Sequence, residues 1–561
     1  MLPAMSRPRG PRSPRRARLV VGLAAVALGL ACASAASAAV SRVLQTPDET
    51  AHVDYAYQVW HGRLPVFEDG VSFQPGRGVR VPPVQWEAQH PPLYYLLVAP
   101  AVGPLVDAGR WKAAVLAARG VNVLLTVGCA LALAWAAAQV ARRRRWAWAL
   151  AVPAVVAPIT PFVQTGGTAY SDPLSTMLVA LSLGLAVLVL RQGPTRARLA
   201  WVAALSALGA LARGSFVVTL VVVSAAVGAA VLLHDRGHRG RWAALLCRAA
   251  AAAAIPFAAA LLAAGWFYRR NIRLTGSWAG GHPDWSEANL GRHQRTLDAV
   301  LHDFDFWRAQ TSLLWQRGRG SVDGRMTGDW GRWVLLATLG IGLVAGLVWL
   351  IRGARAPRVP AAEPAAPAEP EPGAGGATLA PGPTLAARHP LLVDLAILLA
   401  LTAQVLGLLA TIVLHAMNTG GPIVRYLLPG LLPIGLVLAA GVLAFGRRLA
   451  GLALLVYLVL AWGVFGQWMW ITTTQRGVQT AGSTLNGVPW RIVWIALGLF
   501  AVAVLVQAAA LTDWSRRPPA DEAAEPGGTE AGGAGPPPPP SGEDPPTARI
   551  AGTGRGSPAP A

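Results

Sequence analysis

Long apolar segments separated by short arginine-rich stretches constrain this chain more than any other feature. The first runs from Leu19 to Val40, and similar segments recur as far as residue 511. An α-helix needs about 20 apolar residues to cross a bilayer. Of the 561 residues, 54% are hydrophobic and only 13% are charged, which is more apolar material than a soluble fold can bury. The sequence therefore predicts an all-α integral membrane protein.

The formal charge of +21 comes almost wholly from arginine, since Lys112 is the only lysine. A nucleic-acid-binding protein would gather such charge on one soluble domain, whereas these arginines lie between apolar segments, as the positive-inside rule describes. The three cysteines, Cys32, Cys129 and Cys247, lie in or near apolar runs. Neither a disulfide framework nor a cysteine metal site is indicated, and we expect no nucleic-acid partner.

The basic loops set the predicted topology, which has about twelve spans and both termini in the cytoplasm. The first apolar run is interpreted as an uncleaved anchor, although its Ala/Ser-rich end leaves a cleaved signal peptide as an alternative. The bias toward Arg, Ala, Gly and Pro is typical of a GC-rich bacterial genome, so we expect a multi-pass protein of the plasma membrane. The predicted spans are 19–40, 113–141, 146–164, 173–190, 199–233 (two short helices meeting at Arg213 and Gly214), 242–267, 333–351, 390–414, 426–445, 449–471 and 491–511.

The spans fall into two groups. A basic cytoplasmic tail (1–18) precedes an N-terminal transmembrane catalytic module (19–351), which has two larger external loops at 41–112 and 268–331. Further transmembrane helices occupy 390–511. The segments 352–389 and 512–561 are rich in Ala, Pro, Glu and Gly, so we predict a disordered cytoplasmic linker and a disordered cytoplasmic tail.

The first external loop opens with two adjacent acidic residues, Asp48 and Glu49. Thr46 and Glu49 have the spacing of a capping box, in which the glutamate reaches back to the amide of the capping residue. That interpretation explains Glu49 but leaves Asp48 without a role. Helical spacing places Asp48, His52 and Tyr55 on one face. A carboxylate followed four residues later by an imidazole suits a general base or a pair of metal ligands.

The same loop ends in a stretch that returns to the membrane. His90 is followed by two prolines, which suit a helix start, and by Tyr94 and Tyr95, which suit the bilayer interface. Anchoring at the interface and contact with a substrate remain alternative interpretations.

The order of these features resembles the GT-C superfamily of membrane glycosyltransferases. More narrowly, it is similar to uncharacterised multi-pass bacterial members, relatives of protein mannosyltransferases and of lipid A and arabinan glycosyltransferases. The order is the acidic pair, His52, Tyr55, Gly-Arg-Leu-Pro and His-Pro-Pro-Leu-Tyr-Tyr. The resemblance covers roughly residues 19 to 511. Further stretches that support it are 118–122, 170–174, 209–213, 265–271 and 425–429.

This resemblance implies a GT-C-like fold and a transferase that moves a hexose or pentose from a polyprenyl-phosphate donor. The acceptor would be a lipid, polysaccharide or protein of the envelope at the outer membrane face. By position, Asp48 would be the catalytic base on the acceptor hydroxyl, and Glu49 would assist, through a metal ion or by ordering the loop. Asp172 matches a second external acidic position; its alternative is a helix N-cap ahead of Pro173.

A departing lipid phosphate also needs cations, which arginine supplies through its forked donors. Arg269 and Arg270 follow an aromatic stretch at the membrane edge, and Arg425 lies at the outer end of a span, against the positive-inside tendency. Arg213 lies deeper, where a charge is costly, although snorkelling to the interface is its alternative. The predicted substrate-binding residues are His52, Tyr55, His90, Asp172, Arg213, Arg269, Arg270, Arg425 and Tyr426.

Metal binding is not favoured, because no spacing resembles a dedicated cage. Should a divalent ion bind, Asp48, Glu49 and Asp172 are the expected ligands, and no other cofactor is indicated. Two other classes of function stay open. A transporter or lipid flippase should show internal repeats and charged residues near mid-membrane. A non-catalytic envelope-assembly protein would need neither Asp48 nor Arg425.

Overall fold

Apolar helices make up most of this chain, because backbone polar groups inside a bilayer must be bonded within the segment itself. The computed structural model describes residues 14–44, 47–73, 75, 79, 81–235, 242–310, 329–355, 384–418, 420–421, 423–475, 480–481, 484–485 and 488–512. Most of the predicted linker, nearly all of the predicted tail and Thr46 lie outside this part. The described residues belong to one unit, Met1–Trp514.

Within the described residues, ten helices are long and apolar enough to cross a membrane, and one bent pair makes a possible eleventh span. The pair is α5 (Arg145–Val156) and α6 (Thr160–Gly166), which meet at 81°. The ten are α1 (Pro14–Val40), α4 (Trp111–Val140), α7 (Asp172–Gln192), α9 (Val217–Leu233) with η2 (Gly214–Phe216), α10 (Trp242–Thr275), α14 (Asp329–Arg355), α16 (Pro390–Met417), α17 (Leu431–Leu443) with η3 (Val424–Gly430), α18 (Gly446–Gln475) and α19 (Trp490–Leu511).

The predicted count of twelve spans is not confirmed. The difference lies at the bent pair and at α8 (Arg196–Ala212), whose 17 residues extend about 25 Å, at the lower limit for crossing a bilayer. The predicted break at Arg213 and Gly214 is confirmed, because α8 ends at Ala212 and η2 begins at Gly214.

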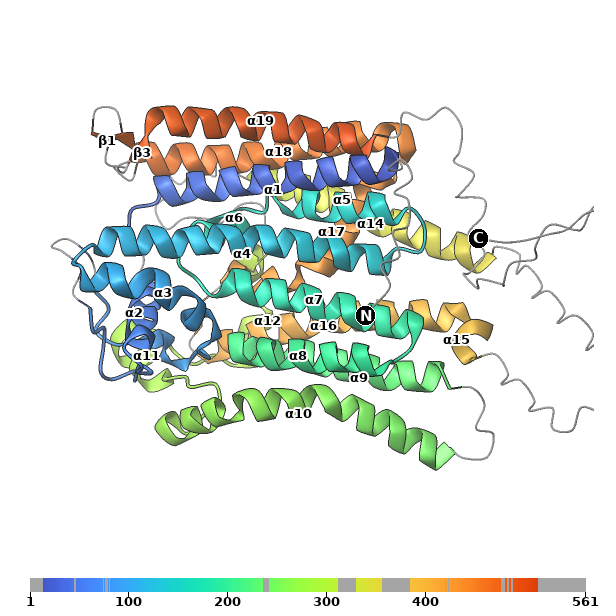
Figure 1. The fold of residues 1–561 in the computed structure, drawn as a ribbon, viewed down its shortest axis with the longest axis horizontal. Coiled ribbons are helices and arrows are strands. Elements are labelled where there is room, and N and C mark those ends of the chain that lie inside the picture. The colour runs from blue at the N-terminus through green and yellow to red at the C-terminus, as the bar shows by residue number, and fades with distance from the viewer. Residues whose placement is uncertain are drawn as a thin grey trace, which may run out of the picture. The chain divides into compact units, whose positions relative to one another are not determined.

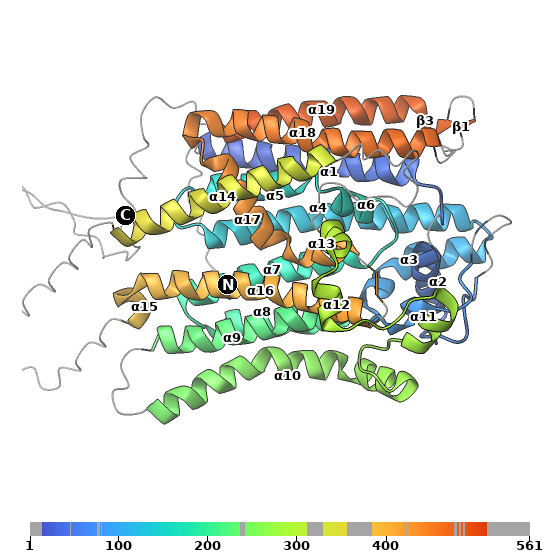
Figure 2. The same ribbon diagram turned by 180° about the vertical axis from the view of Figure 1, so that it is seen from behind.

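The helices pack side by side as a bundle (Figures 1 and 2). The helix α1 packs on α4 and α19, α4 on α7, and α10 along both α8 and α9. Small residues allow the α4–α7 approach: a Cβ atom on Gly184 would lie 2.9 Å from the backbone of Ala136. Such close contact through small residues is typical of helix pairs in membranes.

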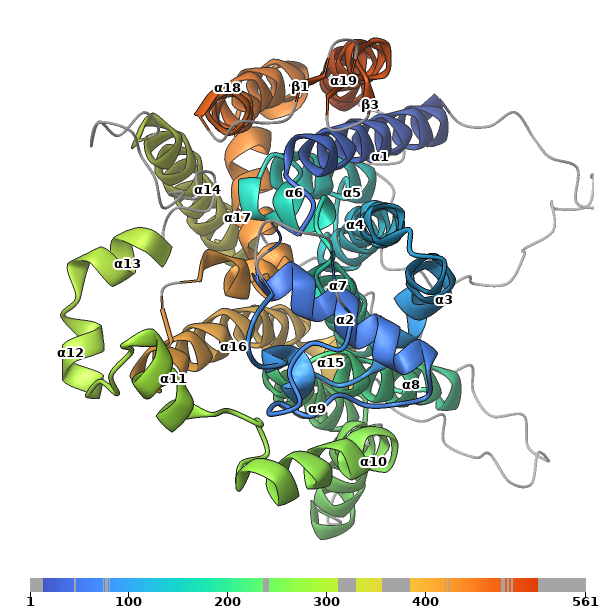
Figure 3. The same cartoon turned by 90° about the vertical axis from the view of Figure 1, so that its left-hand side faces the viewer.

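Shorter elements gather at one end of the bundle (Figure 1, left). The helix α2 (Pro47–Trp60) lies across that end, beside η1 (Trp86–Gln89) and α3 (Leu93–Asp107), as the end-on view in Figure 3 shows. Both predicted external loops therefore meet at the same end. Other short elements are α11 (Pro283–Leu290), α12 (Leu297–Leu301) and α13 (Phe304–Gln310), whereas α15 (Leu385–Arg388) lies toward the opposite end of the bundle.

A small antiparallel sheet between α18 and α19 is the exception to the all-α prediction within the described residues. Its two-residue strands are β1 (Thr480–Ala481), β2 (Thr484–Leu485) and β3 (Val488–Pro489), in the order β1-β2-β3. Thr480 pairs with Leu485, and Thr484 pairs with Pro489.

The loop between α2 and η1 is fastened by Asp54, a fully buried residue that the sequence did not single out. Its carboxylate accepts hydrogen bonds from the backbone and hydroxyl of Ser72, the amide of Phe73, and the side chains of Gln58 and Gln85. A buried carboxylate is stable only with such partners. Asp54 thereby holds this loop against α2, the helix that carries Asp48.

Candidate active site

Asp48 lies in the first turn of α2 and forms an ion pair with Arg425 of η3. Its Oδ2 atom is 2.8 Å from Nη2 of the arginine, and the two side chains are 34% and 15% exposed. The guanidinium of Arg425 also lies 4.5 Å from the ring centroid of Tyr170, a cation–π distance. The site therefore draws on both predicted transmembrane groups, 19–351 and 390–511.

A second carboxylate–arginine pair lies beside the first. Asp172 Oδ1 is 2.8 Å from Nη1 of Arg213, and both side chains are almost buried. Tyr426 lies between the two arginines, with its ring centroid 5.4 Å from the Arg213 guanidinium and 6.0 Å from that of Arg425. Five predicted site residues, Asp48, Asp172, Arg213, Arg425 and Tyr426, are therefore brought together.

Asp172 and Arg213 both lie at helix ends and are each other's ion-pair partner. The residue at the N-cap of α7 is Ser171, and Asp172 is the first residue of the helix itself. Arg213 lies next to the end of α8 with its side chain 9% exposed, and it is held by Asp172. A charge buried in this way requires a partner, and the aspartate provides it.

Glu49 points away from Asp48 and forms a buried ion pair with Arg119. The arginine holds both carboxylate oxygens at 2.8 Å, and each side chain is 1% exposed. The amides of Leu44 and Ala169 donate to the same carboxylate, while Arg119 also donates to three carbonyls at and just after the end of α1. This geometry fits the loop-ordering alternative for Glu49.

His52 and His90 share a carboxylate that the sequence did not single out, Glu87 of η1. His90 Nε2 lies 2.9 Å from Glu87 Oε2, and His52 Nε2 lies 3.5 Å from the same atom. Burial lowers the pKa of His52 to about 4, so this imidazole is neutral near neutral pH. Its Nδ1 lies 2.8 Å from the hydroxyl of Tyr95, which donates to it when Nε2 carries the proton.

Glu87 itself stays ionised. Its burial alone would raise its pKa, but the two imidazoles, the hydrogen bond from His90 and the charge of Arg425 together hold the pKa below its usual range. The only sequence signal for this residue was a glutamate three positions before His90, ahead of the double proline.

Tyr55 makes structural contacts, and its predicted contact with a substrate stays a prediction. Its ring stacks on that of Tyr95 with centroids 3.6 Å apart, and its hydroxyl donates to the carbonyl of His90 at 2.9 Å. The side chain is fully buried. Tyr55 therefore fixes the start of α3 relative to α2.

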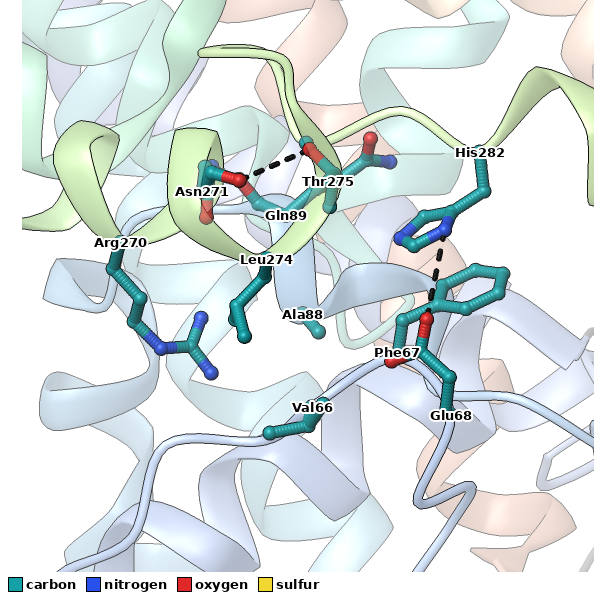
Figure 4. A pocket seen from close by; sticks show the side chains of 11 residues that line it. Val66, Phe67, Glu68, Ala88, Gln89, Arg270, Asn271, Leu274, Thr275 and His282 are labelled. Carbon is teal, nitrogen blue, oxygen red and sulfur yellow. Dashed lines mark hydrogen bonds and ion pairs between the residues drawn. The ribbon is translucent and has the colours of Figure 1, made fainter.

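The neighbouring residues Arg269 and Arg270 lie in different surroundings. Arg270 donates to the carbonyl of Pro65 and lines a small pocket between the end of α10 and the first external loop, opposite Val66 and Phe67 (Figure 4). Arg269 is exposed and lines a larger groove of about 920 Å³.

This larger groove runs between α10 on one side and α8, η2 and α9 on the other. Its lining is mainly apolar, and it includes Gly214, the neighbour of Arg213 in the sequence. Arg269, Arg270 and Arg273 line it at the last turns of α10. A long apolar groove with cations at one end suits an anionic amphiphile.

The three predicted metal ligands do not come together. Asp48, Glu49 and Asp172 each pair with a different arginine. In the part of the chain that the structure describes, no group of three or more His, Cys, Asp or Glu residues is placed to hold a metal ion.

Comparison with known proteins gives structural similarities alone. No family model and no curated protein matches the chain. The fold is similar to the apo form of an oligosaccharyltransferase from Archaeoglobus fulgidus (TM-score 0.40, 12% identity), with 89% of this chain and 56% of that chain covered. It is also similar to ArnT from Cupriavidus metallidurans bound to undecaprenyl phosphate (TM-score 0.42, 16% identity), with 88% of this chain and 75% of that chain covered.

This chain therefore spans little more than half the length of the archaeal protein. At this level of similarity the comparisons describe the arrangement of helices and carry no residue roles into this chain.

Proposed function

We propose that the protein is a membrane glycosyltransferase that moves a sugar from a polyprenyl-phosphate donor to a hydroxyl group of an envelope acceptor at the outer membrane face. The observation that carries the proposal is the ion pair of Asp48 with Arg425, a partly exposed carboxylate beside a cation that has a second arginine close by. Sugar transfer to a hydroxyl needs a base for the acceptor and positive charge for the leaving phosphate.

In the proposed step, Asp48 takes the proton of the acceptor hydroxyl as that oxygen bonds to the anomeric carbon. The bond between this carbon and the phosphate oxygen breaks, and its electron pair stays on the phosphate. Arg425 and Arg213 are the cations available to stabilise that growing charge. An interaction that strengthens as charge develops lowers the barrier more than one that is equal throughout.

The groove between α8, α9 and α10 is the proposed place for the donor's polyprenyl chain. Its apolar walls suit an isoprenoid chain, and Arg269 and Arg273 at its edge suit the phosphate. The groove includes Gly214, so its end lies next to Arg213 in the chain. In this arrangement Arg269 guides the donor and Arg270 holds the first external loop.

Two further carboxylates act in this proposal by positioning. Glu49 and Arg119 tie the start of α2 to α1 and α4, which fixes the backbone that carries Asp48. Glu87 contacts His52 and His90 and so orients both imidazoles. A catalytic group is effective only when such surrounding contacts hold it in place.

The test uses membranes from cells that express the full-length protein, incubated with polyprenyl-phosphate donors labelled in a hexose or a pentose. A transferase releases polyprenyl phosphate and passes the label to an acceptor. A flippase moves intact donor across the membrane without release, and a scaffold protein does neither. The proposal is overturned when no donor of the panel loses its sugar faster than in membranes that lack the protein.

A further inference from the structure

The ion pair of Asp48 with Arg425 is the most open of the three carboxylate–arginine pairs around the site. Glu49 with Arg119 and Asp172 with Arg213 are buried on both sides. Arg119 also holds both oxygens of its carboxylate, whereas Arg425 contacts Asp48 through one nitrogen, Nη2. Of the three arginines, Arg425 can therefore exchange its carboxylate partner with the least rearrangement.

Arg425 also has unused capacity for an anion. Its Nε atom is buried and has no hydrogen-bond partner in the described structure. The guanidinium lies over the ring of Tyr170 at a cation–π distance, and a guanidinium has five N–H donors in total for oxygen atoms. A phosphate matches that fork as well as a carboxylate does and carries more oxygens.

We propose that Arg425 is handed over from Asp48 to the leaving phosphate during the reaction, an inference that rests on the proposed function. Before transfer, the Asp48 carboxylate and the donor phosphodiester each carry one negative charge. When Asp48 takes the acceptor proton it becomes neutral, and the phosphate, now a monoester, gains the second charge as the sugar–oxygen bond breaks. The total charge is unchanged, but the stronger partner of Arg425 is now the phosphate.

The handover also explains how the product leaves. Once Asp48 gives its proton to water, its carboxylate competes again for Arg425 and weakens the hold on polyprenyl phosphate. Asp48 then has two tasks, which are to accept the proton and to displace the product. The second task makes a prediction that a simple base does not make, because removing the carboxylate should strengthen product binding while it stops transfer.

The experiment measures equilibrium binding of labelled undecaprenyl phosphate to the purified full-length protein in detergent at fixed ionic strength. Asp48→Asn and Asp48→Ala should each bind it about fivefold more tightly than the wild type, the size expected for one partly exposed ion pair. Asp69→Asn, which removes the same charge from an exposed position of the same loop, should bind like the wild type. Thermal unfolding identifies any variant that has lost its fold, and the two Asp48 variants serve as independent tests.

Equal or weaker binding by the folded Asp48 variants overturns the handover and leaves sugar transfer by the wild type intact. An equal gain in Asp69→Asn also overturns it, because the effect would then come from net charge alone. Absence of binding in the wild type and in both Asp48 variants overturns the handover together with the proposed function.

Discussion

Arg425 and Asp48 are 377 positions apart in the sequence, yet their side-chain atoms lie 2.8 Å apart in the structure. The contact joins α2, at the end of the bundle, to η3 in front of α17. Because Tyr426 lies against Arg213, which pairs with Asp172, four separate stretches of the chain form a single charged cluster.

The buried pair of Glu49 and Arg119 should be essential for stability. Glu49→Gln leaves the arginine buried without its counter-charge, which costs about 3–5 kcal/mol in buried ion pairs. We expect a clear fall in the thermal unfolding midpoint of the protein in detergent. Arg142→Gln is the matched control, because its pair with Asp394 is more exposed and such pairs contribute about 1 kcal/mol or less. Equal midpoints for the two variants would contradict the role of Glu49.

The pair of Asp172 and Arg213 should show strong coupling. Asp172→Asn and Arg213→Gln each leave one buried charge without its partner, whereas the double variant leaves none. The double variant should therefore lose about 1–3 kcal/mol less free energy of unfolding than the sum of the two single losses. Sugar transfer should fall in all three variants, because Arg213 belongs to the proposed phosphate site. Additive losses of stability would show that the two side chains do not interact in this way.

His52 should make the protein sensitive to acid. The pKa of this buried imidazole is lowered from 6.5 to about 4, so between these values the unfolded chain binds a proton that the folded protein does not. The free energy of unfolding should therefore fall as pH falls through this window, by about 3 kcal/mol in full. Because the pKa of Glu87 is also lowered, the free energy of unfolding should fall further once the pH drops below the usual glutamate pKa.

The measurement is the thermal unfolding midpoint across that pH range. His52→Gln should flatten the decline, whereas His293→Gln, at an exposed position, should leave it unchanged. An unaltered pH dependence in His52→Gln would show that burial of this imidazole does not set the acid sensitivity.

Bulk added inside the groove beside α10 should weaken use of a long polyprenyl donor, whereas bulk added just outside the groove should not. Leu261→Trp adds bulk to a residue that lines the groove and should raise KM for a long polyprenyl donor more than for a short one. Leu262→Trp makes the same change one residue away, at an exposed leucine outside the lining, and should behave like the wild type. Equal effects of the two substitutions on initial rates would argue against a lipid chain in this groove.

Much of the helical layout follows from local sequence properties. Apolar length predicts most of the spans, and the pattern around residue 48 predicts α2, which ends just before Gly62 at φ +71°. The break beside Arg213 is also evident, since an arginine and a glycine interrupt an apolar run. The number of spans is harder to predict, because the 17 residues of α8 lie close to the length that separates a span from a shorter helix.

The partners of the charged residues could not be predicted in the same way. Helical periodicity indicates which residues share a face, but Arg119 and Glu49 are 70 positions apart and lie on different helices. Glu87 carries no periodic signal at all, and its role becomes evident only when η1 packs against α2. The sequence therefore indicates which charged residues are candidates for the site, whereas their pairing depends on tertiary structure.

The proton-accepting role of Asp48 is the central claim, and the rate of sugar transfer by Asp48→Asn tests it most directly. The asparagine keeps the size of the side chain but cannot accept the proton, so the rate of polyprenyl phosphate release should fall by about a hundredfold to ten-thousandfold. Asp69→Asn should retain the wild-type rate in the same membranes. A folded Asp48→Asn variant that transfers sugar at the wild-type rate would contradict the account.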